Sequence, residues 1–323
     1  MRVIYTDLTS KIFKKELLNR IKCIATIGVF DGLHLGHKFI IQKVKNQAKA
    51  LKLFSLVITF DTPPQIILNK HFLGCISDLE DKTKLIANLG VDYLLILRTS
   101  KKLLKLTAVE FLDVISRDFF ITKLIVGEGF SFGHNRSTAV FGLKSLAKKY
   151  KFDLEIVRRQ RIDGRIISST FIRKCIRDSA FKTVYKFLGR NYYLRGVVTK
   201  GIGLGRRIGF PTANIDFDNY VLPSNGVYAG LVYIKKRYYM AAINIGIKPT
   251  ISKERKISVE AHIIDFKKNI LGKKIKIIFI KKIRKEKKFF SISELKNTIR
   301  KDIDYVKNFL SQHKPLLNID HPF

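Results

Sequence analysis

The change in hydrophobic pattern near residue 190 constrains the fold of this chain more than any other feature. Before it, short apolar runs alternate with segments of helical periodicity, as in an α/β domain built on a parallel sheet. After it, short β-rich runs are separated by Gly, Pro and Asn without helices between them, which indicates a small antiparallel barrel or sandwich. The 323 residues therefore predict two domains, residues 1–186 and residues 187–323.

The expected elements of both domains follow from these periods. In the first domain, apolar runs predict buried strands at residues 21–29, 53–60, 93–97, 123–127 and 153–157. A helix is expected from Lys38 onward, and a hydroxyl cluster at residues 168–170 predicts the start of a short basic helix. In the second domain, the predicted elements are strands at residues 226–234, 240–245, 257–265 and 274–280 and a final amphipathic helix at residues 293–310, which we expect to pack on the barrel.

Charge is the most unusual feature of the composition. The chain has 62 Lys plus Arg against 26 Asp plus Glu, a formal net charge of +36. Such a charge attracts polyanions, but a Lys excess accompanied by abundant Ile, Asn and Phe is also what A- and T-rich codons produce. Composition alone leaves both explanations open. A hydrophobic content of 46% excludes a disordered basic tail.

Cysteine usage and the N-terminus bear on the location of the protein. The three cysteines, Cys23, Cys75 and Cys175, are far apart in the sequence, which argues against a disulfide frame or a cysteine zinc site and fits a reducing compartment. The first residues lack the apolar region of a signal peptide, and no uncharged apolar run of about 18 residues occurs. We expect a cytoplasmic protein that makes no membrane contact.

A segment rich in glycine and histidine joins the first predicted strand to the first helix, where parallel α/β folds bind ligands. Glycines let the backbone approach a phosphate, and a helix N-terminus adds a positive dipole end. The imidazoles of His34 and His37 can donate to phosphate oxygens as charge builds on them, which stabilises a phosphoryl-type transition state. The residues assigned to this site are Gly28, Phe30, Asp31, Gly32, His34, Gly36 and His37.

The residues themselves leave alternatives for this first site. His34 and His37 have a spacing that also suits zinc, although no third and fourth ligand of suitable type lies nearby in the sequence. The hydroxyl cluster at residues 168–170, with Arg173 one turn later, has the make-up of a compact anion clamp. Taken alone, the same cluster is an ordinary helix cap.

A second site is indicated in residues 196–214, which hold five glycines and three basic residues. The N–H groups of such a loop can wrap phosphates, and Lys and Arg side chains balance their charge. The spacing differs from the P-loop pattern, so a different kind of nucleotide loop is required. Taken alone, the segment is equally consistent with a glycine-rich barrel turn that binds nothing.

The first domain resembles the FMN adenylyltransferase module of bacterial bifunctional riboflavin kinase/FAD synthetases. The segments that carry the resemblance are residues 28–37, 60–64, 126–136 and 167–173. The resemblance implies a Rossmann-like nucleotidyltransferase fold in which His34 and His37 contact the phosphates of ATP. It also implies a set of residues that hold the phosphates from the other side, namely Ser168, Ser169, Thr170 and Arg173.

The second domain resembles the riboflavin kinase module of the same family, on residues 209–214, 226–229, 244–250 and 259–266. The resemblance implies that Glu260 activates the ribityl hydroxyl and that Thr212 and Asn214 hold Mg²⁺ with the ATP phosphates; oxygen ligands suit that ion. On strand pattern alone, Glu260 is more often a surface residue. The residues of the glycine loop assigned to the ATP phosphates are Lys200, Gly201, Gly205, Arg206 and Pro211.

Flavin contacts are assigned to residues within the same motifs, namely Phe60, Gly127, Phe130, Arg136, Tyr228 and Asn244. In the first domain, Gly129 stands where the family usually has Asp and Thr62 where it usually has Pro; in the second, Lys248 stands where Arg is common. The loss of a carboxylate at Gly129 removes a metal or substrate contact, which puts the efficiency of adenylyl transfer in question.

The resemblance spans residues 15–310, with both modules in the family's order, and implies a bifunctional transferase. It implies that ATP phosphorylates riboflavin to FMN in the second domain and adenylylates FMN to FAD in the first, and we expect a monomer or weak homo-oligomer. One rival is a nucleotidyltransferase for another phosphate acceptor, against which the kinase-like second half counts. The other is a basic nucleic-acid-binding protein, whose recognition helix or aromatic RNA motifs are missing. Residues 251–300 hold 16 Lys plus Arg against 5 Asp plus Glu, and these basic residues match no motif. This favours A- and T-rich codons over a polyanion-binding surface as the origin of most of the charge.

Overall fold

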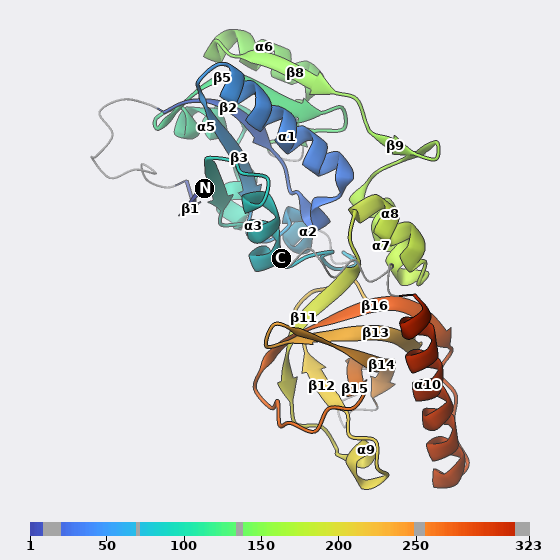
Figure 1. Cartoon of the computed structure of the whole chain (residues 1–323). Coiled ribbons are helices and arrows are strands. Elements are labelled where there is room, and N and C mark those ends of the chain that lie inside the picture. The colour runs from blue at the N-terminus through green and yellow to red at the C-terminus, as the bar shows by residue number, and fades with distance from the viewer. Residues whose placement is uncertain (9–20, 69–71, 134–137, 249–255, 314–323) are drawn as a thin grey trace. The chain divides into compact units, whose positions relative to one another are not determined.

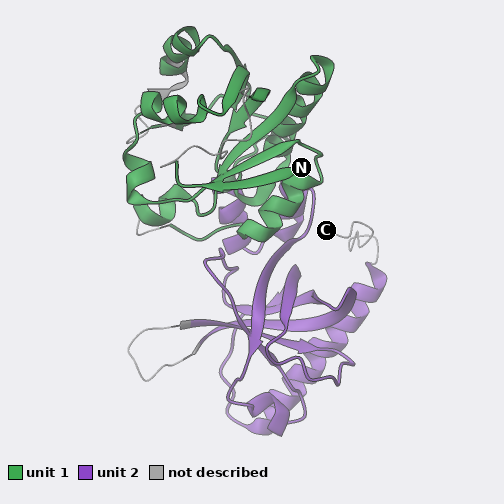
Figure 2. Ribbon diagram, turned by 90° about the vertical axis from the view of Figure 1, so that its left-hand side faces the viewer, with its two compact units in different colours: residues 1–169, 323 green, residues 170–322 purple. Residues whose placement is uncertain are grey.

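The structure is a computed structural model that describes residues 1–8, 21–68, 72–133, 138–248 and 256–313. Its chain forms two compact units, residues 1–169 and residues 170–322, which Figure 1 traces from blue to red and Figure 2 colours green and purple. Each unit is described by itself.

The first unit is built on a six-stranded parallel sheet with the strand order β1-β4-β3-β2-β5-β8. The order reverses at β2, so the loop that follows β2 opens at the point where parallel α/β sheets form their ligand crevice. The strands are β1 (Arg2–Thr6), β2 (Ile21–Ile27), β3 (Phe54–Phe60), β4 (Tyr93–Leu97), β5 (Phe119–Gly127) and β8 (Asp153–Val157).

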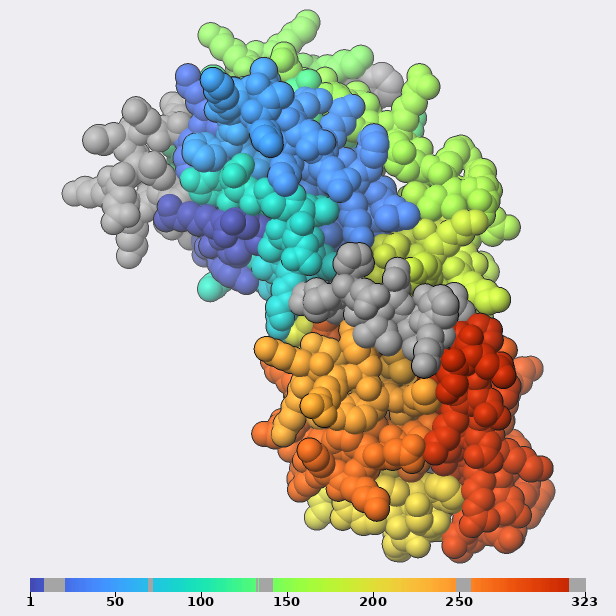
Figure 3. All heavy atoms as spheres, in the orientation of Figure 1, coloured from blue at the N-terminus to red at the C-terminus, as the bar shows by residue number. Residues whose placement is uncertain are grey.

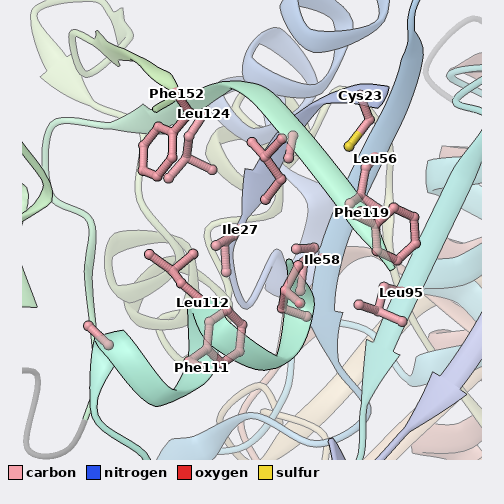
Figure 4. Close-up of a cluster of buried hydrophobic side chains, with 14 of the residues drawn as sticks. Cys23, Ile27, Leu56, Ile58, Leu95, Phe111, Leu112, Phe119, Leu124 and Phe152 are labelled. Carbon is pink, nitrogen blue, oxygen red and sulfur yellow. The ribbon is translucent and has the colours of Figure 1, made fainter. Parts of the chain in front are cut away.

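Helices cover both faces of this sheet, because alternate residues of each strand point to opposite sides. Leu56 and Ile58 of β3 face α5 (Ala108–Ile115), whose Phe111 and Leu112 complete the cluster in Figure 4. Val57 faces the other way, into a cluster with residues of α1 (Leu35–Ala50) and α3 (Leu79–Ala87). Each fully buried side chain of this size contributes about 1.5–3 kcal/mol, so the two clusters hold the sheet edge rigid beneath its loops.

The remaining elements of the first unit are short or lie on the faces of the sheet. The helices are η1 (Asp31–Leu33), α1 (Leu35–Ala50), α2 (Pro64–Leu68), α3 (Leu79–Ala87), α4 (Lys101–Lys105) and α6 (Val140–Tyr150). Two small hairpins are formed by β6 (Ser131–Phe132) with β7 (Thr138–Ala139) and by β9 (Arg161–Ile162) with β10 (Arg165–Ile166).

The second unit is a closed antiparallel barrel in the order β11-β12-β15-β14-β13-β16, in which β11 pairs with both β12 and β16. Closure removes the free sheet edges that an open sandwich would leave. The strands are β11 (Tyr192–Thr199), β12 (Ala213–Asp216), β13 (Gly226–Ile234), β14 (Arg237–Lys248), β15 (Lys256–Ile263) and β16 (Lys274–Arg284).

The helices that the structure describes beside the barrel strands are α7 (Ser169–Arg177), α8 (Phe181–Leu188), α9 (Leu204–Arg207) and α10 (Ile292–Gln312). The long helix α10, red in Figures 1 and 3, runs along the barrel and packs Val306 and Leu310 against its outer apolar residues. The Arg284 guanidinium at the end of β16 holds the buried Asp302 carboxylate with both Nε and Nη2, at 3.1 and 2.8 Å. This two-pronged ion pair between guanidinium and carboxylate anchors α10 to the barrel.

The predicted fold class is confirmed: a parallel α/β domain precedes an antiparallel barrel with a C-terminal helix. Between the two all-β alternatives that the pattern allowed, the structure is the barrel. The helix expected from Lys38 begins three residues earlier, at Leu35, because the His34 side chain caps it. Strand β1 was not expected. It is an edge strand that pairs only with β4 within the described residues, and most of its side chains are exposed.

Candidate active sites

The two histidines of the first site lie together at the N-terminus of α1. Nδ1 of His34 accepts a hydrogen bond from the backbone N–H of His37 at 3.2 Å, and the two rings stack with centroids 3.5 Å apart. A cap that accepts at Nδ1 leaves Nε2 of a neutral His34 as its N–H donor. His34 is buried, and its ring packs closely over Gly36. A Cβ at residue 36 would lie 3.3 Å from the imidazole, so glycine leaves room for the ring. The structure thus brings a ring donor to a helix N-terminus, which suits a phosphate.

The loop between β2 and α1 is held in a left-handed conformation. Phe30 has φ 48° and Gly32 has φ 73°, and the buried Phe30 ring packs where a side chain at Gly28 would stand, 2.8 Å from its Cβ. The buried Asp31 carboxylate accepts from the backbone N–H groups of Ile76 and Ser77 at 3.0 and 3.3 Å. Asp31 therefore shapes the loop through its side chain, and its contact with ATP stays a prediction.

The start of the hydroxyl cluster contacts the loop between β2 and α1, and the residues that make this contact belong to the first unit. The Ser169 hydroxyl donates to the backbone carbonyl of Asp31 at 3.1 Å, and Ile167 lies beside Gly36. Ser168, half-buried, stands between them in the chain. Thr170 and Arg173 belong to the second unit, and their contact with the phosphates stays a prediction.

The flavin motif of the first unit lies along the carboxyl edge of the same sheet. Phe60 ends β3 and Gly127 ends β5, where it lies against Ile40 of α1. Phe130 follows a turn in which its N–H donates to the Gly127 carbonyl at 2.9 Å. Arg136 lies outside the described residues.

The departure at Gly129 has a specific neighbour. A Cβ at Gly129 would lie 2.5 Å from Nη2 of Arg159, so the guanidinium occupies the space that a side chain there would use. The adjacent Glu128 carboxylate accepts from the backbone N–H of Arg159 at 3.4 Å. A basic group therefore stands beside Gly129, where the resemblance described above implies an acidic side chain.

The kinase site predicted in the second unit forms a row across three barrel strands. In the strand register, Glu260 of β15 stands opposite Asn214 of β12 on one side and Asn244 of β14 on the other. Along β15, the half-buried Glu260 alternates with the buried Val259 and Ala261, so this row of side chains lies on the face away from the barrel core. Residues up to 46 positions apart in the sequence thus become direct neighbours.

The glycine loop folds over this row. The Thr212 hydroxyl donates to the Glu260 carboxylate at 3.3 Å, and the Pro211 carbonyl is 2.8 Å from Nδ1 of His262. Gly201 is indispensable to this arrangement, because a Cβ there would lie 2.1 Å from the Asn214 amide nitrogen. Gly205 likewise lies against the backbone of Phe210, whereas Lys200 and Arg206 are exposed at the loop surface.

Tyr228, assigned to flavin by its motif, is fully buried in the barrel. Its ring meets Phe279 edge-on at 5.6 Å, and its hydroxyl is 2.9 Å from that of Ser179. Burial raises the pKa of Tyr228, which keeps the phenol neutral. A direct flavin contact by Tyr228 stays a prediction.

The donor set of the kinase site consists of a hydroxyl, an amide and a carboxylate, on Thr212, Asn214 and Glu260. Oxygen donors of this kind suit Mg²⁺, which takes a few protein ligands and shares the nucleotide phosphates. Among the side chains that the structure describes, no group of three or more His, Cys, Asp or Glu is arranged to hold a metal ion.

Sequence reasoning missed one buried charge at the edge of the first sheet, Lys82 of α3. Its side chain is 3% exposed, and Nζ donates to the backbone carbonyls of Val29 and Phe60. A lysine in a helical period gives no signal of burial, because its partners are 53 and 22 residues away.

Comparison with known proteins matches both units. The riboflavin kinase family matches residues 188–310, and the FAD synthetase family matches residues 17–171. The bifunctional riboflavin kinase/FMN adenylyltransferase of Buchnera aphidicola from the pea aphid, strain APS, is 34% identical over 295 residues, 90% of this chain and 94% of its own. That of Escherichia coli K12 is 32% identical over 296 residues, 91% of this chain and 94% of its own.

The chain belongs to the bifunctional riboflavin kinase/FMN adenylyltransferase family. Membership confirms the resemblance and makes the chain a transferase with riboflavin kinase and FMN adenylyltransferase activities.

A solved structure supports the fold of this family member. The crystal structure described as a macrolide-efflux protein from Streptococcus pneumoniae matches with a TM-score of 0.81 and 27% identity, over 95% of this chain and 99% of its own. Within the part of the chain that the structure describes, no helix combines the length and apolar character needed to cross a membrane.

Proposed function

We propose that this chain makes FAD from riboflavin in two ATP-dependent steps, with the residues predicted above in the roles that follow. The barrel phosphorylates riboflavin to FMN, and the parallel-sheet unit transfers AMP from ATP to FMN and releases pyrophosphate. The main support is the pairing of three barrel strands, which places Glu260 directly between Asn214 and Asn244. We place the boundary between the two catalytic domains at residues 186 and 187.

In the kinase step, Glu260 is the general base. Its carboxylate accepts the proton of the ribityl hydroxyl as the hydroxyl oxygen attacks the γ-phosphorus of ATP and ADP leaves. The Thr212 hydroxyl, 3.3 Å from Glu260, and the Asn214 amide oxygen would hold Mg²⁺, which neutralises phosphate charge when bound. Asn244 completes the row and contacts the flavin, as does Tyr228.

The glycine loop holds the triphosphate of ATP in this step. Backbone N–H groups at Gly201 and Gly205 approach the phosphates, while Lys200 and Arg206 balance their charge. Pro211 fixes the exit of the loop, because its carbonyl is tied to His262. Since Gly201 packs directly on Asn214, the position of the loop and that of the metal ligand are coupled.

In the adenylyl-transfer step, the phosphate oxygen of FMN attacks the α-phosphorus of ATP. His34 and His37 donate to the phosphate oxygens at the N-terminus of α1, where the helix dipole favours negative charge. The backbone of the loop contributes at Gly28, Phe30, Asp31, Gly32 and Gly36. The residues that hold the phosphates opposite are Ser168, Ser169, Thr170 and Arg173, and those that contact the flavin are Phe60, Gly127, Phe130 and Arg136.

The remaining expectations concern the setting of the reactions. We propose a cytoplasmic enzyme that acts as a monomer or weak homo-oligomer, with small-molecule partners and no specific nucleic acid. None of the three cysteines forms a disulfide within the part of the chain that the structure describes, and Cys23 and Cys175 are buried, which is compatible with a reducing compartment.

Two substitutions test the partition of the activities. Glu260→Gln keeps the shape of the side chain and removes the base, so FMN formation from riboflavin is expected to fall by a factor of about 10²–10⁴. His37→Asn removes an imidazole donor, so FAD formation from FMN is expected to fall by about 10²-fold. Each variant keeps the other activity within about twofold, since the altered residues lie in different units. Flavins are separated by chromatography after single-substrate incubations.

Asp216→Asn is the matched control for the barrel, because it neutralises an exposed carboxylate on β12 two residues after Asn214. It is expected to retain both activities. Loss of both activities in Glu260→Gln, or full FAD synthesis in His37→Asn, would show that the assignment of roles is wrong.

A further inference from the structure

One buried cation lies beneath the adenylyl-transfer site and takes no part in the chemistry described above. Lys82 sits on α3, is 3% exposed and points its ammonium at the carboxyl ends of two neighbouring strands. Nζ donates to the Val29 carbonyl, just after β2, at 3.3 Å and to the Phe60 carbonyl, at the end of β3, at 2.5 Å. Val29 lies within the loop assigned to ATP, and Phe60 begins the motif assigned to the flavin.

Both partners of Lys82 are themselves tied to the rest of the sheet edge. The Val29 carbonyl also accepts from the Thr59 hydroxyl at 3.1 Å. Beyond Phe60, the Asp61 carboxylate accepts from the backbone N–H of Thr99 at 2.9 Å. Lys82 is therefore the charged centre of a hydrogen-bonded frame that spans β2, β3 and the loop after β4.

The charges around the ammonium come from several elements. Asp31 lies on η1, Asp61 follows β3, and Cys75 lies on the segment before α3. Burial lowers the pKa of Lys82 to about 8, against the opposing effect of Asp31, Cys75 and Asp61. An ammonium so placed is costly to bury, and retaining it implies that its donors are needed there.

We propose that Lys82 is a positioning residue for adenylyl transfer, whose ammonium fixes the loop that binds the ATP phosphates relative to the segment that binds FMN. This inference rests on the proposed function of the first unit. In-line transfer requires the FMN phosphate and the α-phosphorus of ATP to be held in a narrow range of distance and angle. The ammonium, which binds the backbone of both loops, sets that range without itself touching either substrate.

If the Lys82 ammonium positions the two loops, adenylyl-transfer activity and the stability of the first unit change in opposite directions as the pH rises. Between pH 8 and 10.5 the unfolded chain holds the Lys82 proton and the folded chain does not, so this group makes the folded unit more stable as pH increases. A purely structural lysine therefore predicts adenylylation that is maintained above pH 8. A positioning ammonium predicts adenylylation that falls as the proton leaves.

The experiment measures FAD formation from FMN and ATP by the full chain from pH 7 to about 9.5, with Lys82→Arg and Lys82→Met beside the wild type. Riboflavin phosphorylation and the thermal unfolding midpoint are recorded on the same samples. We expect the wild-type kcat/KM for FMN to fall about tenfold across this range, with Lys82→Arg nearly flat because arginine stays charged. Lys82→Met is expected to lose about 100-fold in kcat/KM for FMN at pH 7, mainly through a lower kcat, with phosphorylation unchanged.

The outcomes are distinguishable from failure of the proposed function. A wild type that makes no FAD at pH 7 contradicts the proposed function itself. A wild type that makes FAD equally well at pH 7 and 9.5, or that falls in parallel with Lys82→Arg, overturns the positioning role, and neither result depends on whether Lys82→Met folds.

Discussion

At the scale of single residues, Gly129 is the position where the sequence resemblance implied a carboxylate and the chain has none. The Arg159 guanidinium fills the space beside it, 2.5 Å from the position of a Cβ. The change from a carboxylate to a glycine beside a guanidinium makes the local charge more positive. Both substrates of adenylyl transfer are anions, so we expect this change to favour their binding.

Gly129→Asp tests this interpretation. The new carboxylate is expected to pair with Arg159 and cancel its charge, which raises the KM for FMN about two- to fivefold, the range of an exposed ion pair. Gly129→Asn is the control, because it adds the same bulk without the charge. Steady-state kinetics of FAD formation measure both. A lower KM in the aspartate variant, or equal effects of the two, would contradict the assigned role of Arg159.

At the scale of elements, an ion-pair network fixes the helix that carries the histidines. Glu155 of β8 accepts from Lys43 and Gln47 of α1 at 2.5 and 3.0 Å and from Lys123 of β5 at 2.9 Å. Burial raises the pKa of Glu155, but these hydrogen bonds outweigh it and lower the pKa to about 2. The network therefore stabilises α1 against the sheet as long as the carboxylate is ionised.

The pH dependence of stability checks this network. Because the folded pKa is lowered from 4.5 to about 2, its contribution is complete above pH 4.5 and is lost as the pH falls through 2. Glu155→Gln is expected to lower the free energy of unfolding by about 2 kcal/mol at pH 7, and the difference shrinks toward pH 2. Denaturant unfolding followed by circular dichroism measures it.

The control for this network is Glu80→Gln, which breaks the exposed pair of Glu80 with Lys84 on α3. It is expected to change stability by less than about 0.5 kcal/mol. Equal effects of the two substitutions at pH 7 would show that the Glu155 network is not specially stabilising.

The spacing of apolar residues predicted most helices and strands, because in these elements the buried positions are the apolar ones. The strands at Tyr93–Leu97, Asp153–Val157 and Gly226–Ile234 have the predicted bounds. β1 escaped prediction because its mostly exposed side chains carry no apolar alternation. The closure of the barrel depends on pairing between β11 and β16, about 80 residues apart, which no local pattern encodes.

The candidate sites were predictable to the extent that they lie in short motifs. Motifs named Asn214, Glu260 and Asn244 separately, and only the register of the barrel placed them side by side. Lys82 stood in no recognised motif, and its burial follows from tertiary packing at the sheet edge. Sequence reasoning therefore finds residues that touch substrates more readily than residues that act through the backbone.

At the scale of the whole molecule, some of the basic residues behind the net charge of +36 form hydrogen bonds and ion pairs that stabilise the fold. Lys282 donates to the Ser224 hydroxyl and the Asn225 carbonyl at 2.8 Å each, and Arg284 anchors α10 through Asp302. In the glycine loop, exposed Lys200 and Arg206 stand where an anionic nucleotide is proposed to bind. The charge thus supports the barrel and its proposed site without requiring a polyanion partner.

The central claim is that one chain carries riboflavin through FMN to FAD. The most direct test incubates the purified full chain with riboflavin, ATP and Mg²⁺ and separates the flavins by chromatography over time. We expect FMN to appear first and FAD to follow, with pyrophosphate released in step with FAD. Riboflavin that stays unchanged would contradict the kinase claim, and FMN that accumulates without FAD would contradict adenylyl transfer by the first unit.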